Sequence, residues 1–485
     1  MTHRPTVPLS HCLLSLLALM GATGTMEAQQ VDRTRPPQLG PAPRFRIPTA
    51  ATARLPNGLE LIVVEQHDVP VVDINLIVRA GSVHDPRELP GLATFTAGML
   101  DEGAGTRSAL AIAEEVAFLG AQFSTSASYE FAQVSLHVPR RQLPAALDLM
   151  ADVVLRPTFP DSEISRQREL RRAALLQLRD QPTQQSPIVF GAIVFGTEHP
   201  YGRPLQGTEE AVAALSRDRV ERFYRSYYRP NNARLLIVGD ITMEEARRLI
   251  GQRFGPWERG EISPPPVATP PRHGNRTLYL VDKPGAAQSV FRLGNVGVPR
   301  STPDYYAIQV MNTILGGSFT SRLNQNLRET HGYTYGAGSL FAMRRLAGPF
   351  QATASVVTAK SDSALVEFMR ELRRIRDELV PADELDKAKQ YLVLGFPSEF
   401  ETTAGTAQQF LDLVINDLPL DWYQTYLDRI TAVSAEDVRR VARSYIDVDN
   451  LVITVVGDRQ QIEAGLRAVG EGPIVLRDFW GRPVP

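Results

Sequence analysis

Cysteine is almost absent from this sequence of 485 residues, which contains only Cys12. Cys12 lies near the N-terminus and comes before the apolar run that ends at Met20, a position that argues against a lipoprotein anchor. If this segment is removed on export, the mature chain has neither a disulfide nor a thiol nucleophile. A chain of this length can form a core large enough to fold without disulfides.

The sequence also has few histidines and a small net charge. The eight histidines include no pair spaced i, i+3 or i, i+4, so no helix presents the two imidazoles of a common zinc site. The formal net charge is −2, which argues against nucleic acid or an anionic membrane surface as the main partner. The sequence also has no phosphate-binding glycine loop of Walker type and no nucleophile elbow.

Only the N-terminal segment has the pattern of a targeting signal. His3 and Arg4 precede the apolar run, and small residues follow it as far as Ala28. The run is too short to cross a bilayer, so we predict a secretory signal peptide at residues 1–28 in preference to a buried helix. Residues 29–48 are rich in Gln, Pro and Arg, and we expect them to be disordered. The protein is therefore predicted to be exported to the periplasm, without a membrane span.

The rest of the chain contains an internal repeat. Residues 216–232 begin with serine, end with asparagine and lead into an apolar strand that closes with Val-Gly-Asp, and residues 434–450 do the same. The intervals from serine to asparagine and from asparagine to glycine are equal in both copies, which chance rarely produces. A Pro-rich linker at 258–275 separates the copies. We therefore predict two homologous α/β halves, residues 49–257 and 276–485.

A short apolar helix is predicted between Gly91 and Leu100, after strands at residues 59–64 and 71–78. It reads Gly-Leu-Ala-Thr-Phe-Thr-Ala-Gly-Met-Leu, with small and apolar residues at the spacing of a buried helix. Glycines follow where such a helix would end.

This segment resembles the zinc-site helix of the pitrilysin/insulinase family of metallopeptidases, which reads Gly-Leu-Ala-His-x-x-Glu-His-Met-Leu. In that motif two histidines bind zinc, and the glutamate activates water as the general base. Here Thr94 and Gly98 stand in place of the histidines, and Ala97 stands in place of the glutamate. None of these side chains can bind zinc or accept a proton, so the resemblance implies that this chain has no metal site.

The family takes its third zinc ligand, a glutamate, from a helix further along the chain. We predict a long polar helix at residues 162–182, in which Leu176 and Gln177 occupy the corresponding positions. Glu169 lies two turns earlier, and we expect it to be a solvated helix residue. Residues 199–204, His-Pro-Tyr-Gly-Arg-Pro, again resemble the family, but as a structural loop without a role in metal binding.

In the second half, residues 321–336 predict a helix that is followed by a strand. Leu323 and Leu327 lie on one helical face, Gly332 ends the helix, and Tyr335 begins the strand.

The family carries an arginine and a tyrosine seven residues apart at this place, and Arg328 and Tyr335 match that spacing. In the family, the pair faces the zinc site across a cavity and donates hydrogen bonds to the scissile carbonyl as it becomes an oxyanion. Arginine supplies a permanent charge for this purpose, and tyrosine supplies a neutral donor. Two alternatives remain open: Tyr333 is a second candidate for the tyrosine, and an arginine near a helix end can have a purely structural role.

The resemblance covers roughly residues 50–465 and implies an α+β fold of two homologous α/β sandwich halves. Each half would be a mixed, largely antiparallel sheet covered by helices, and together they would form one half of a clam shell. Some bacterial members are heterodimers in which one chain carries the zinc motif and the other carries the Arg/Tyr pair.

The resemblance therefore implies a non-catalytic, substrate-binding subunit of an exported zinc peptidase. Such a subunit has no cofactor of its own; its homologous partner holds the zinc, and peptides are the substrates. A purely structural or peptide-holding protein is the alternative. A self-sufficient peptidase would need metal ligands that the sequence does not contain.

Overall fold

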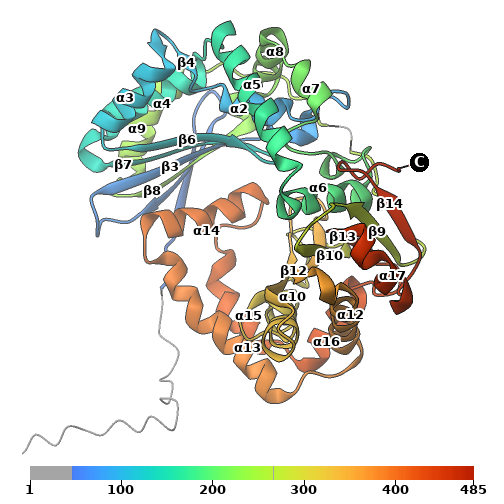
Figure 1. Cartoon of the computed structure of the whole chain (residues 1–485). Helices are drawn as coiled ribbons and strands as arrows, with labels where there is room; N and C mark the ends of the chain where they lie inside the picture. The colour runs from blue at the N-terminus through green and yellow to red at the C-terminus, as the bar shows by residue number, and fades with distance from the viewer. Residues whose placement is uncertain (1–45, 266, 485) are drawn as a thin grey trace, which may run out of the picture. The chain divides into compact units, whose positions relative to one another are not determined.

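The computed structural model describes residues 46–265 and 267–484. The predicted signal peptide, residues 1–28, and nearly all of the predicted lead-in, residues 29–48, lie outside these ranges. Within the described ranges, no helix combines the length and the apolar composition needed to cross a bilayer. The longer strands form two six-stranded sheets (Figure 1).

The first sheet comes from the first half of the chain and has the strand order β1-β2-β8-β3-β7-β6. Its strands are β1 (Ala50–Arg54), β2 (Glu60–Glu65), β3 (Val71–Val78), β6 (Gln122–Ala127), β7 (Ala132–Pro139) and β8 (Ala233–Gly239). Val72, Ile74 and Leu76 of β3 are buried on one face of the sheet, as the alternation of apolar and polar residues predicts.

The second sheet has the order β11-β12-β10-β13-β9-β14. Its strands are β9 (Thr277–Asp282), β10 (Gln288–Val296), β11 (Thr334–Phe341), β12 (Pro349–Val357), β13 (Val452–Gly457) and β14 (Ile474–Arg477). The pairs β2/β8 and β9/β13 are parallel, whereas the series β8-β3-β7-β6 and β13-β10-β12-β11 are antiparallel. The two sheets therefore repeat one topology, to which β1 and β14 each add an edge strand, and the predicted fold of two homologous halves is confirmed.

The helices of the first half are α2 (Leu92–Gly98), α3 (Ala109–Phe118), α4 (Leu143–Leu155), α5 (Asp161–Leu178), α6 (Pro182–Phe195), α7 (Glu209–Ala213), α8 (Arg217–Tyr227) and α9 (Met243–Phe254). All of these except α6 share one core with the sheet of their own half. α4 lies on β7, and α9 lies on β1 and β2. α2 packs between α8 and β6, which places the segment with the lost zinc motif beside the edge of the sheet.

The second half is built in the same way. Its helices are α10 (Tyr305–Asn312), α11 (Arg322–Asn324), α12 (Ser361–Asp377), α13 (Ala382–Gly395), α14 (Thr403–Ile415), α15 (Tyr426–Ala432), α16 (Ala435–Tyr445) and α17 (Arg459–Val469), and a π-helical turn, η6 (Gln325–Thr330), continues α11. α12 lies on β12, and Phe368 and Leu372 are fully buried in the second core.

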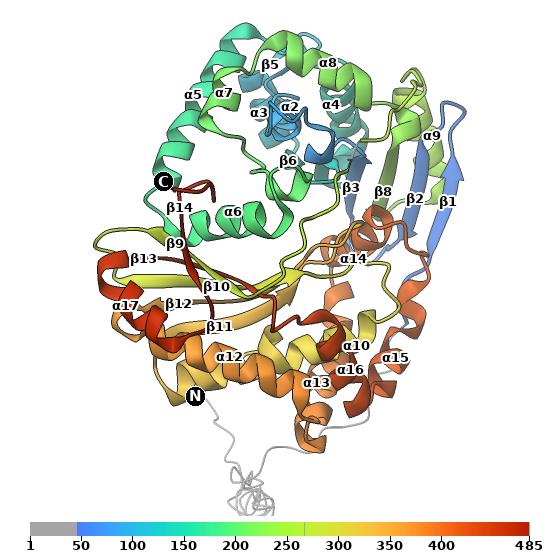
Figure 2. The ribbon, with the colours of Figure 1, turned by 90° about the vertical axis from the view of Figure 1, so that its right-hand side faces the viewer.

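One helix of each half packs on the sheet of the other half (Figures 1 and 2). α6 lies against β10 and β13 of the second sheet, where Val189 and Phe190 are buried beside Val290 and Val456. α14 lies against β3 and β8 of the first sheet. The halves are thus joined by reciprocal helix packing as well as by the linker, and the predicted division at residues 258–275 stays a prediction.

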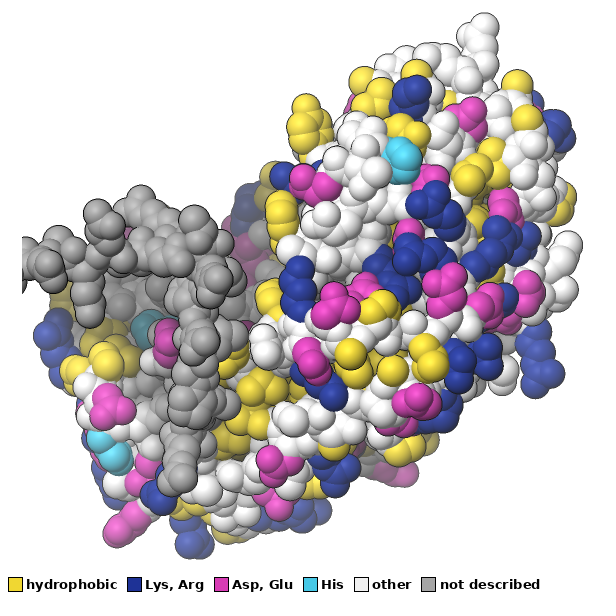
Figure 3. Space-filling view, turned by 90° about the horizontal axis from the view of Figure 1, so that it is seen from below, with side chains coloured by type: hydrophobic (Ala, Val, Ile, Leu, Met, Phe, Trp, Pro, Cys, Tyr) yellow, Lys and Arg dark blue, Asp and Glu magenta, His cyan; other side chains and the backbone are white. Residues whose placement is uncertain are grey.

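Charges of both signs cover the surface. On the face seen in Figure 3, the Lys and Arg side chains are interleaved with Asp and Glu side chains. This view shows no broad face of one sign, in keeping with the net charge of −2 for the whole chain.

Candidate functional site

The start of α2 is held by a buried carboxylate that the sequence analysis did not single out. Asp85 accepts hydrogen bonds from the backbone N–H groups of Gly91, at 2.8 Å, and of Ala93, at 2.7 Å. Burial raises the pKa of Asp85 to about 7, although these two hydrogen bonds act in the opposite direction. Gly91 has a φ of 93°, a left-handed conformation that favours glycine at this entry to the helix.

Thr94 and its neighbours on α2 have structural surroundings. The hydroxyl of Thr94 lies 2.6 Å from the carbonyl oxygen of Leu205 and 3.0 Å from that of Gly91, so it donates within the protein. Ala97 is fully buried. A Cβ atom on Gly98 would meet no atom within 4 Å, so the space around the position of the lost second histidine is open.

A guanidinium lies beside the position of the lost metal ligands. Nη1 of Arg171 on α5 donates to the hydroxyl of Thr94 at 3.1 Å and to the carbonyl of Gly91 at 3.0 Å. The guanidinium also lies 5.1 Å from the ring centre of Phe95. Burial lowers the pKa of Arg171 to about 10, so the group remains a cation at neutral pH.

These residues do not fit a zinc ion. Zinc requires thiolate, imidazole or carboxylate ligands, and the three motif positions supply a hydroxyl, a methyl group and a glycine, beside a cation that repels metal ions. The carboxylate of Asp85 is engaged by the backbone N–H groups of Gly91 and Ala93. Among the described residues, no group of three or more His, Cys, Asp or Glu side chains could hold a metal.

The positions that correspond to the third ligand lie on α5, which is shorter than predicted. The expected helix 162–182 ends at Leu178, and a separate helix, α6, begins at Pro182. Leu176 is 49% exposed. Among the described residues, Glu169 forms an ion pair with its neighbour Arg172 alone, at 3.6 Å, as expected of a solvated helix residue.

The loop at residues 199–204 is structural, as the sequence analysis expects. His199 is buried, and its Nδ1 accepts a hydrogen bond from the backbone N–H of Tyr201 at 3.0 Å. Burial lowers the pKa of His199 to about 4, so the imidazole is neutral.

Arg328 lies in the turn η6, beside β11, the edge strand of the second sheet. Its guanidinium lies 4.7 Å from the ring centre of Phe319, and its Nε lies 3.1 Å from a carboxylate oxygen of Glu329. Phe319 is itself 61% exposed. The guanidinium is thus held over an aromatic ring at the surface.

Tyr335 lies at the start of β11 and is 88% exposed. The pairing of β11 with β12 shifts its register between Thr334 and Ala337, the stretch that contains Tyr335. The other candidate, Tyr333, stacks on His331 at 4.9 Å and packs against the second core. Tyr335 is therefore the more accessible of the two phenols.

Two residues at the site, Arg171 and Asp85, were missed by the sequence analysis. Four arginines occur on α5, and no spacing distinguishes Arg171 from the others. Asp85 lies further from the start of the helix that it caps than a residue at a normal N-cap position does. No local sequence pattern therefore identifies it.

Models of one peptidase family match the chain in two adjacent segments. Residues 61–208 match the model described as insulinase (peptidase family M16), and residues 214–392 match the model described as the peptidase M16 inactive domain.

Individual relatives agree with the family models. A protein of Streptomyces coelicolor described as an uncharacterized zinc protease is 26% identical over 446 residues, which cover 90% of this chain and 95% of the relative. A Mycobacterium leprae protein of the same description is 30% identical over 282 residues, 58% of this chain and 63% of the relative. The crystal structure of a peptidase M16 inactive domain from Pseudomonas fluorescens is 26% identical, with a TM-score of 0.79, and covers 84% of this chain and 98% of that chain.

The repeated sheets, the helix that retains the frame of the zinc motif and these matches lead to one conclusion. The chain belongs to the insulinase (M16) peptidase family, as a member in which Thr94, Ala97 and Gly98 replace the His, Glu and His of the zinc motif.

Proposed function

We propose that this protein is the non-catalytic, substrate-binding subunit of an exported heterodimeric zinc peptidase. A homologous partner holds the zinc, and this chain supplies Arg328 and Tyr335 to the site at which the partner cleaves peptides. The export of the protein rests on the predicted signal peptide at residues 1–28.

The observation that carries the proposal is the contrast between the two candidate sites of the chain. At α2, the hydroxyl of Thr94 is engaged by Arg171, and the donors needed for zinc are replaced. At β11, the phenol of Tyr335 is 88% exposed. The residues that match the substrate-binding pair are therefore accessible to a second protein. At the lost metal site, by contrast, the residues that stand in place of the ligands cannot hold zinc.

The chemistry of Arg328 and Tyr335 suits the stabilisation of a developing oxyanion. A guanidinium and a phenol both donate hydrogen bonds, and neither needs to lose a proton during the reaction. Removing one donor to an oxyanion typically lowers kcat by about 100-fold to 1,000-fold.

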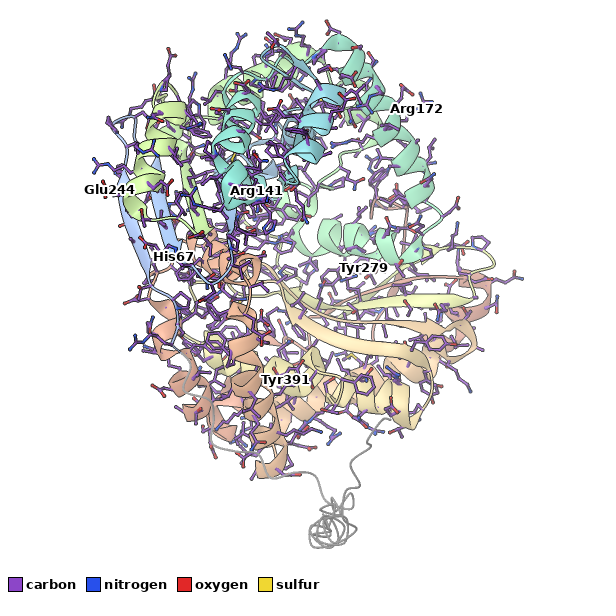
Figure 4. The ribbon with its side chains drawn as sticks, turned by 90° about the vertical axis from the view of Figure 1, so that its left-hand side faces the viewer. His67, Arg141, Arg172, Glu244, Tyr279 and Tyr391 are labelled. Atoms are coloured by element: carbon purple, nitrogen blue, oxygen red, sulfur yellow. The ribbon has the colours of Figure 1, made fainter. Side chains whose placement is uncertain are left out.

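The test begins with purification of the protein and its partner from the native source, with zinc measured in the complex and in the isolated chain. We expect zinc to follow the partner. Arg328→Ala and Tyr335→Phe should then lower the kcat of the complex without dissociating it, whereas Arg172→Ala and Tyr391→Phe serve as matched controls. Arg172 and Tyr391 are exposed residues on α5 and α13 (Figure 4). Unchanged kcat in both test variants would remove the catalytic assistance.

A peptide-holding protein without a part in catalysis is the second candidate, and the sheet edges favour it. β6 and β11 are the terminal strands of their sheets, which is the position at which an extended peptide can add a strand. In this case Arg328→Ala and Tyr335→Phe would raise the Kd for the peptide and leave kcat of any associated peptidase unchanged.

A further inference from the structure

A second polar site lies away from α2 and from the Arg328/Tyr335 pair. It is a cavity of about 340 Å³ at the junction of the two halves. We call it the arginine cavity, because five of its lining residues are Arg54, Arg79, Arg234, Arg259 and Arg345. It is formed by ends of β1, β3 and β8, by the segment that follows α9, and by the loop between β11 and β12.

One aspartate holds three of these arginines together. Asp417 follows α14 and pairs with Arg79, with Arg234 at 2.7 Å and with Arg345 at 2.9 Å. Its φ is 55°, a left-handed conformation that is uncommon for a residue other than glycine. Asp417 therefore adopts an unfavourable backbone conformation at the point where it balances several positive charges.

The other two carboxylates nearby are already engaged. Glu60 pairs with Arg234 at 3.1 Å. Glu130 accepts hydrogen bonds from the hydroxyl of Tyr201 and from the backbone N–H groups of Arg345, at 3.0 Å, and of Leu346, at 3.2 Å.

Positive charge is therefore in excess around the cavity. Arg54 and Arg259 are exposed at its rim and form no ion pair with any described residue. Among the described residues that line the cavity, five carry guanidinium groups and two, Glu60 and Glu130, carry carboxylates, with Asp417 beside them. Burial lowers the pKa of Arg79, and repulsion from Arg345 and Arg234 lowers it further. An anion placed among these groups would relieve the repulsion that this pKa reflects.

We propose that the arginine cavity binds a small oxyanion with more than one negative charge, either a phosphate group or a di- or tricarboxylate. Guanidinium groups bind both through paired, charge-assisted hydrogen bonds of fixed geometry. Because the lining comes from both halves, the bound anion would also hold the halves together. The site shares no lining residue with α2 or with Arg328 and Tyr335, so it is independent of the proposed peptidase function.

The test titrates the full-length mature protein with inorganic phosphate and, separately, with citrate, by isothermal titration calorimetry at constant ionic strength. We expect saturable binding of at least one anion. Binding of phosphate alone assigns the site to phosphate groups, and binding of citrate alone assigns it to polycarboxylates. A lack of saturable binding of both anions would overturn the proposal.

Variants at the rim locate the binding. Arg259→Gln and Arg54→Gln remove charges that form no ion pair among the described residues, so we expect both variants to fold normally. Each should weaken anion binding by roughly 10-fold. Arg141→Gln is the matched control, because Arg141 is exposed at the opposite end of β3 and outside the cavity (Figure 4). Equal affinity in the wild type and in both rim variants would show that the anion binds elsewhere and would refute the assignment.

Discussion

The position of Arg171 leads to a specific prediction about which substitutions would restore a metal site. The double variant Thr94→His/Gly98→His places two imidazoles one helical turn apart on α2, at the positions that bind zinc in the family motif. The open space around the Cβ position of Gly98 leaves room for the second imidazole. We nevertheless expect this variant to bind zinc poorly, because Arg171 remains beside the first.

The size of the effect follows from the distance between the charges. Nη1 of Arg171 lies 3.1 Å from the hydroxyl of Thr94, and zinc lies about 2.1 Å from an imidazole nitrogen. If that nitrogen took the place of the hydroxyl, the two cations would be roughly 5 Å apart. At an effective dielectric constant of about 20, their repulsion is about 7 kcal/mol, or about five orders of magnitude in affinity. Movement of the guanidinium into solvent recovers part of this energy, so we expect a difference of at least about 100-fold.

Isothermal titration of zinc into three variants measures this difference. The triple variant Thr94→His/Gly98→His/Arg171→Ala should bind zinc at least about 100-fold more tightly than the double variant. A second triple variant, with Arg172→Ala in place of Arg171→Ala, should behave like the double variant, because Arg172 lies at the outer side of α5 (Figure 4). Equal zinc affinity in all three variants would refute the reasoning that the guanidinium excludes a cation.

Two further predictions concern stability. Phe190→Ala on α6 should cost about 3 to 5 kcal/mol in unfolding free energy, because Phe190 is buried on the second sheet. In urea denaturation, Trp257 of the first half and Trp422 of the second half should report the same unfolding transition. Separate transitions at the two residues would contradict the joint packing of the halves. His199→Gln tests the buried imidazole, whose pKa of about 4 in the folded protein lies below the unfolded value of about 6.5. The unfolded state then binds more protons than the folded state between these pH values. His199 should therefore lower the free energy of unfolding progressively as the pH falls from about 6.5 to 4, by up to about 3 kcal/mol. In urea denaturation, His199→Gln should remove this component of the pH dependence.

Local sequence patterns were sufficient for much of the fold. The alternation of apolar and polar residues predicted β3 at Val71–Val78, and the repeated Val-Gly-Asp endings predicted that β8 and β13 occupy equivalent places. Strand alternation and repeat spacing are properties of the chain itself, so they can be seen without knowledge of what each element contacts.

Contacts between the halves could not be predicted in this way. α6 begins at Pro182, at the end of the single polar helix that the sequence predicts, so the sequence pattern does not show the break between the two helices. The apolar residues of α6 are buried on the sheet of the other half, and no local pattern shows which sheet a helix will cover. The contact of Arg171 with Thr94 was missed for the same reason, because it depends on how α5 packs beside α2.

The central claim is that Arg328 and Tyr335 contact a peptide bound at the partner's zinc site. Photo-crosslinking tests it most directly, with Tyr335 replaced by p-benzoylphenylalanine in the assembled complex and with Tyr391 replaced in the same way as the control. The account predicts a light-dependent adduct between position 335 and a labelled peptide substrate, and none at position 391. Efficient crosslinking of the peptide to the partner alone, with no adduct at position 335, would contradict it.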